Sequence, residues 1–112
     1  MTWRTEHPWF PEADMPAVPA WWEDRSWHND AMPMFHAGML LVAVDPADPA
    51  LSDFAEWRRD GTMRRFQVAR MDPPPHDRPE WGPQLDGGVV LLGTDDWGEV
   101  LRLVADNFLL EG

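Results

Sequence analysis

The sequence of 112 residues contains no Cys, Lys, Ile or Tyr and only two Ser. Without Cys there can be no disulfide, no thiolate nucleophile and no Cys-based metal site. Ser26 and Ser52 lie outside any Gly-x-Ser-x-Gly pattern. Gly87-Gly88 precede an expected strand rather than a helix, which excludes the usual phosphate-binding turn. We therefore expect a protein without enzyme activity and without a cofactor.

Long hydrophobic runs are also missing. The longest, Ala37–Val44, is far shorter than the ~20 residues that a membrane helix needs. Residues 2–14 are polar, aromatic and interrupted by Pro, unlike a secretory signal. These patterns predict a soluble, cytoplasmic protein with no membrane partner.

Acidic residues dominate the charge. Twenty Asp and Glu stand against nine basic residues, all of them Arg, for a formal net charge of −11. Nine of the acids and only two Arg fall within residues 72–112. Direct nucleic-acid binding needs a basic surface, so this charge excludes it as the expected function. Five Arg between Arg58 and Arg70 form a local cluster, which we expect to pair with nearby carboxylates.

The first 35 residues differ from the rest. They hold five of the eight Trp and five of the twelve Pro, and they show no sustained helix or strand periodicity. Because each Trp buries about 150–250 Å², we expect most of these rings to clamp residues 1–35 onto the domain as an irregular arm. In the alternative, some rings stay exposed as anchors for a partner. The predicted organisation is one globular unit, with this arm packed on a core domain of residues 36–112.

Residues 37–112 contain recognisable elements. Ala37–Val44 reads as a buried strand, and Asp48 and Pro49 mark the start of a helix over residues 49–60 that Gly61 ends. Thr62–Met71 reads as an edge strand with interspersed Arg. Five Pro make Asp72–Asp86 an extended loop, and Gly88–Gly93 reads as another buried strand. Thr94 is expected to cap a last helix, whose apolar stripe comprises Trp97, Val100, Leu101, Val104, Phe108 and Leu109.

This order predicts a small α+β domain of βαββα type, with the ferredoxin-like arrangement in which the first and third strands are central. We expect part of residues 26–36 to supply the missing fourth strand by pairing antiparallel beside Met39–Val44. Element order alone assigns no function.

Two His and one carboxylate form the most site-like cluster. His28, Asp30 and His36 would suit a divalent metal if the chain brought them together. Their spacing matches no established ligand motif, and Asn29-Asp30 is also typical of a turn. We therefore expect no metal site, and a site formed by these three residues is the less favoured alternative. His7 and His76 lie in Pro-rich stretches, where we expect both to be exposed.

The surplus of carboxylates favours binding over chemistry. We expect a small acidic inhibitor that occupies the basic groove of a nucleic-acid-handling protein by presenting carboxylates where phosphates would lie. The candidate contacts lie on the Pro-rich loop and at the start of the last helix: Asp72, Asp77, Glu80, Asp86, Asp95, Asp96 and Glu99. Alternatively the acidity only confers solubility, and exposed Trp side chains anchor a partner or a second copy of the chain.

In size, acidity and lack of catalytic residues the chain resembles phage-encoded inhibitors, including anti-CRISPR proteins. Immunity proteins that neutralise nuclease toxins share the same profile. The resemblance is one of type, so it assigns no residue a role. The acidic net charge predicts that the partner is a basic protein.

Overall fold

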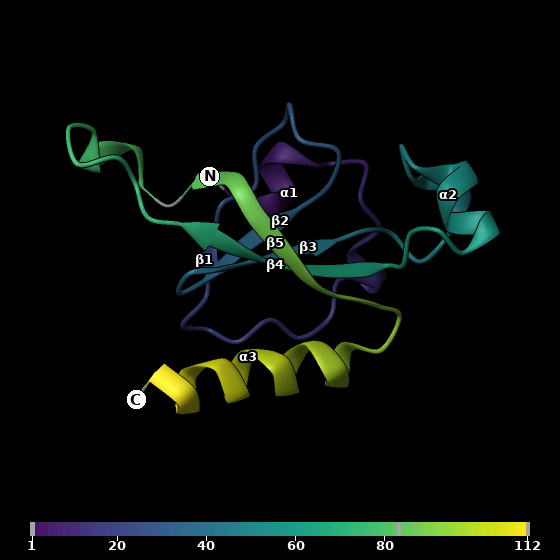
Figure 1. Cartoon of the computed structure of the whole chain (residues 1–112). Coiled ribbons are helices and arrows are strands. Elements are labelled where there is room, and N and C mark those ends of the chain that lie inside the picture. Colours follow the sequence, from purple (N-terminus) through teal and green to yellow (C-terminus); the bar gives the residue numbers. More distant parts are fainter. Residues whose placement is uncertain (1, 83, 112) are drawn as a thin grey trace.

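The computed structural model describes residues 2–82 and 84–111, and one antiparallel sheet lies at its centre. The five strands follow one another in space as they do in sequence (Figure 1). They are β1 (Glu23–Asp24), β2 (Met34–Ala37), β3 (Leu40–Val44), β4 (Phe66–Asp72) and β5 (Gln84–Thr94). The result is a small α+β domain built on a meander, so the coarse prediction of fold class is confirmed.

The first hairpin divides the apolar run that we expected to form a single strand. Gly38 adopts a φ of 63° between β2 and β3, a left-handed conformation that Gly adopts readily. Residues 37–44 therefore belong to two strands, with Met34 opposite Ala43. The expectation that residues 26–36 contribute a strand antiparallel to residues 39–44 is confirmed.

The expected ferredoxin-like order is not found among the described strands. Residues 62–71 were expected at a sheet edge, but β4 lies between β3 and β5. The interspersed Arg residues suggested an edge strand, but Arg64 and Arg65 precede β4 and only Arg70 lies within it. The edges are instead the two-residue β1 and the eleven-residue β5.

The structure contains three short helical elements where none was predicted, and it divides one predicted helix in two. The arm contains α1 (Trp3–Glu6) and η1 (Glu12–Asp14), and η3 (Pro79–Trp81) lies in the Pro-rich loop. The helix expected over residues 49–60 is split into η2 (Pro49–Leu51) and α2 (Ala55–Asp60). Asp48 caps the first piece through the Ala50 amide, 2.9 Å away, and Gly61 ends the second at φ 84°, both as predicted.

The last helix, α3 (Trp97–Glu111), covers one face of the sheet (Figure 1). Its buried side consists of Val100 and Val104, with Trp97 and Leu103 packed against the core. Leu101 is exposed, contrary to the expected stripe. The side chains of Phe108 and Leu109 lie outside the described residues. No described helix is both long and apolar enough to span a membrane.

The arm contributes to the same core. Trp3, Phe10 and Trp22 are buried in one cluster with sheet residues and with α3. Trp22 meets Trp97 edge-on at 5.6 Å between ring centroids, and the Trp97 indole N–H donates to the Ala17 carbonyl at 3.2 Å. Trp9, Trp21 and Trp27 remain largely exposed. The expectation that most of the five N-terminal Trp rings clamp the arm is therefore wrong, because only Trp3 and Trp22 are buried. The role of the exposed rings as anchors for a partner stays a prediction, as does the division at residue 35.

Candidate binding groove

The two faces of the sheet are covered differently. Val42, Val68 and Leu92 lie in register on the face that packs against α3. Leu41, Ala69 and Val90 lie in register on the other face. A groove of about 710 Å³ opens over this second face. We call it the open-face groove.

The walls of the open-face groove come from outside the sheet. The chain over residues 29–34 contributes Met32, which is buried together with Ala43 and Met63, and Phe54 packs against this cluster. Phe54 and Trp57, at and within α2, contribute aromatic rings stacked at 5.6 Å between centroids. Both rings belong to the segment predicted as a helix over residues 49–60. They line the groove, and Trp57 remains 55% exposed.

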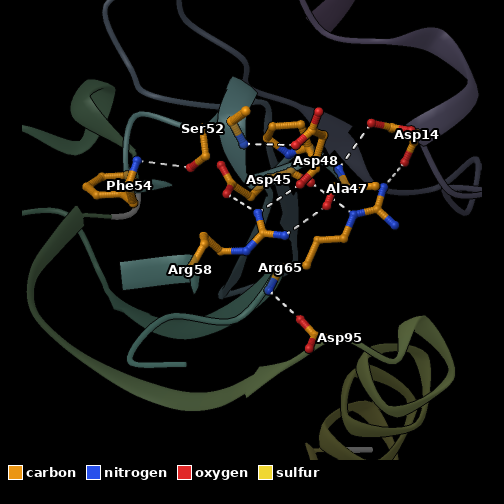
Figure 2. A network of polar contacts seen from close by, with 11 residues as sticks. Asp14, Asp45, Ala47, Asp48, Ser52, Phe54, Arg58, Arg65 and Asp95 are labelled. Atoms are coloured by element: carbon orange, nitrogen blue, oxygen red, sulfur yellow. Dashed lines mark hydrogen bonds and ion pairs between the residues drawn. The ribbon is translucent and has the colours of Figure 1, made fainter. Parts of the chain in front are cut away.

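A buried ion pair ties α2 to the segment that follows β3. The Arg58 guanidinium, 7% exposed, pairs with the fully buried Asp45 carboxylate at the end of β3 (Figure 2). Its NH1 also donates to the Pro46 carbonyl at 2.8 Å and its NH2 to the Ala47 carbonyl at 3.3 Å. Because Trp57 is the neighbour of Arg58 in the helix, this anchor positions the aromatic wall of the groove.

A second Arg joins the arm, the sheet and the start of α3. Arg65 donates through Nε to the Asp45 carbonyl at 3.1 Å and through NH2 to the Asp14 carbonyl. Its backbone amide donates to Asp95 Oδ1 at 2.9 Å (Figure 2). Arg64 contacts the other Asp95 oxygen at 3.2 Å. The expectation that Arg in the 58–70 cluster pair with carboxylates is thus confirmed for Arg58 and Arg64.

The seven acids predicted as partner contacts fall at two ends of the β4–β5 pair. Asp72, Asp77 and Glu80 are exposed at the loop end, where Asp72 pairs with Gln84. Asp95, Asp96 and Glu99 lie at the opposite end, next to Thr94, which pairs with Phe66. The six steps from Phe66 to Asp72 span roughly 20 Å at about 3.3 Å per residue. The side chain of Asp86 lies outside the described residues.

Two acids of the second group have structural tasks. The Arg65 amide, and then Arg64, lower the pKa of Asp95, so this carboxylate is held charged within the fold. Asp96 Oδ1 accepts from the Gly98 amide at 2.9 Å and caps α3, while the Thr94 hydroxyl accepts from the Asp96 amide at 3.0 Å. The predicted cap at Thr94 is therefore displaced: α3 begins at Trp97, and Asp95 and Asp96 precede its first turn.

The His residues do not assemble a metal centre within the described part of the chain, where no group of three or more potential ligands is close enough to hold an ion. His28 Nδ1 contacts Glu6 Oε1 at 3.1 Å, whereas His36 lies on β2 opposite Glu23. His76 is exposed as expected. The same expectation for His7 is wrong, because its side chain is only 1% exposed.

Sequence reasoning missed the open-face groove. The available signal was the set of methionines at positions 32, 34 and 63, together with Phe54 and Trp57, in segments without a clear buried periodicity. Searches against protein-family models, curated proteins and solved structures return no significant match for this chain.

Proposed function

We propose that this protein is a non-enzymatic binding protein that docks a partner protein in the open-face groove. The observation that carries the proposal is apolar surface left uncovered on a sheet face. Trp57 is 55% exposed and Val90 is 65% exposed at the groove. Contiguous apolar surface of this kind marks interaction sites in proteins that are otherwise well packed.

A partner protein fits the groove better than a small ligand does. A volume of about 710 Å³ could hold either. The apolar surface, however, continues onto the rim, where the side chains of Trp57 and Val90 are exposed to solvent. A small molecule inside the groove would leave both side chains exposed. Exposed Trp is also a frequent anchor of protein interfaces. Met32, Met34 and Met63 supply flexible side chains that can adapt to the occupant.

The test compares two equally exposed Trp side chains. A partner captured from lysate by the wild-type protein would be purified and titrated against Trp57→Ala, Val90→Asp and Trp81→Ala. Trp81, 58% exposed, lies in η3 and is not part of the groove lining. We expect the two groove variants to weaken binding at least tenfold and Trp81→Ala to change it less than twofold. Thermal unfolding of each variant controls for folding.

Wild-type affinity in both groove variants would contradict the proposal. The proposal would also be contradicted if a photo-crosslinking residue captured the partner when placed at position 81 but not when placed at position 57.

A second candidate function keeps the acidic loop as the contact. Asp77 and Glu80 are exposed between β4 and β5, where they could meet the basic groove of a nucleic-acid-handling protein as an anti-CRISPR inhibitor or an immunity protein would. Electrostatic complementarity would speed the encounter and make the complex sensitive to salt. The two candidates place the contact on different parts of the molecule, so substitutions separate them.

A further inference from the structure

We infer that the occupant of the open-face groove is an amphipathic α-helix with a basic polar face. The inference rests on the proposed function and names the class of partner segment. Two independent features support it, the hydrogen-bonding state of the groove floor and the charge of its rim.

The floor of the groove offers few free backbone groups. It is formed by β3, paired on both sides with β2 and β4, by β4, paired with β3 and β5, and at its margins by Met34 of β2 and Val90 of the edge strand β5. The hydrogen-bonding groups of a strand lie in the plane of the sheet, so those at the β5 edge point sideways and not into the groove. An extended peptide lying on this face would bury its own amides and carbonyls without strand partners, at a cost for each unpaired group. A helix satisfies its backbone internally and needs only an apolar stripe to fill the groove. The floor therefore favours a helix.

The rim of the groove is acidic. Asp30 lines it directly. Asp53 and Glu56 border an adjoining hollow of about 490 Å³ that shares Phe54 and Trp57 with the groove. Asp60 follows at the end of α2, and hydrogen bonds from Thr62, itself a lining residue, lower the pKa of this carboxyl.

Cations near this rim are few. Arg59 is exposed on α2, but Arg58 of the same helix turns inward to Asp45 and does not offset the rim acids. With a formal net charge of −11 for the whole chain, a helix that presents Lys or Arg beside its apolar stripe is complementary to the site.

The test uses three synthetic 18-residue peptides with a fluorescent label and the full-length protein. The first has Leu at helical spacing and Lys on the remaining face. The second has the same composition in scrambled order, and the third has Glu in place of Lys. We expect the first to bind at least tenfold more tightly than either of the others, and to weaken as salt is raised.

Two charge-matched variants locate the binding. The triple variant Asp53→Asn/Glu56→Gln/Asp60→Asn removes three charges beside the groove, and Asp77→Asn/Glu80→Gln/Asp106→Asn removes three charges elsewhere on the surface. We expect the first to lower affinity for the basic amphipathic peptide at least fivefold and the second less than twofold. Trp57→Ala should lower it tenfold or more.

Equal binding of the scrambled peptide, or equal effects of the two triple variants, would overturn the inference by showing attraction to net charge alone. A purified partner whose binding depends on Trp57, but which the basic amphipathic peptide does not displace, would also overturn it while leaving the proposed function intact. If Trp57→Ala did not weaken binding of the purified partner, the proposed function itself would be rejected.

Discussion

His7 is a buried side chain whose charge state affects the stability of the arm. It lies at the end of α1 with its ring edge-on to Trp9, and its Nε2 has no hydrogen-bond partner among the described residues. Burial lowers the pKa of His7, although the carboxylates of Asp30, Glu6 and Asp24 act in the opposite direction. The native arm therefore holds a neutral imidazole.

This lowered pKa predicts a loss of stability in acid. At pH values between the lowered pKa of His7 in the folded chain and the ordinary value near 6.5, the unfolded chain binds a proton at His7 that the folded chain excludes. Stability contributed by the neutral His7 is thus complete above about pH 6.5 and declines as the pH falls below it, by at most about 1.4 kcal/mol per pH unit for one proton. Urea unfolding at several pH values measures the slope.

His7→Leu should flatten that slope between pH 6.5 and 5. His36, whose pKa burial also lowers, should account for part of what remains, and His36→Leu provides the comparison. An unchanged slope in His7→Leu would show that the arm does not exclude the proton.

At the scale of the element, Asp96 shows why charge and structure must be separated. Its carboxylate is both a predicted partner contact and the cap of α3. Asp96→Ala should lower the free energy of unfolding by about 1 kcal/mol, as the loss of a helix cap does. Asp96→Asn keeps an acceptor and should cost less than half as much. Chemical denaturation of both variants gives the two values, and equal stability of Asp96→Ala and wild type would contradict the role as a cap.

The elements that sequence reasoning predicted well are those with local causes. Asp48 before Pro49 and Gly61 after α2 were assigned correctly because a cap or a left-handed residue depends on its immediate neighbours. The division of residues 37–44 by Gly38 was missed because an uninterrupted apolar run gives no sign of where a turn falls.

Sheet order and the candidate site were harder, because both depend on contacts distant in sequence. Arg64 and Arg65 suggested an exposed edge, yet Arg65 reaches Asp14 and Asp45 across the fold, and β4, the strand that follows it, is central. The groove joins residues 29–34, the sheet and α2. Trp57 lies in a segment predicted to be helical, and its exposure at the groove depends on where the other two segments lie.

At the scale of the whole molecule, the acidic surface is divided. One group, Asp77 and Glu80, lies on the loop, and another, Asp53 and Glu56, lies at α2. Reversing the charge of two acids in either group changes the net charge, and hence the long-range field, by the same amount. If the groove is the docking site, Asp53→Lys/Glu56→Lys should weaken partner binding at least tenfold, whereas Asp77→Lys/Glu80→Lys should weaken it about threefold or less. Titration at fixed ionic strength measures both. The reverse ranking would favour the inhibitor that mimics nucleic acid.

The contact between Trp22 and Trp97 has a consequence for synthesis on the ribosome. Strands β2, β3 and β4 can pair with near neighbours as they emerge, because a meander needs only short loop closures. The indole of Trp22 is synthesised before all five strands, and α3 follows them, so the core around Trp22 is complete only after α3 has been made. Until then a nascent chain carries an uncovered aromatic surface that chaperones could recognise.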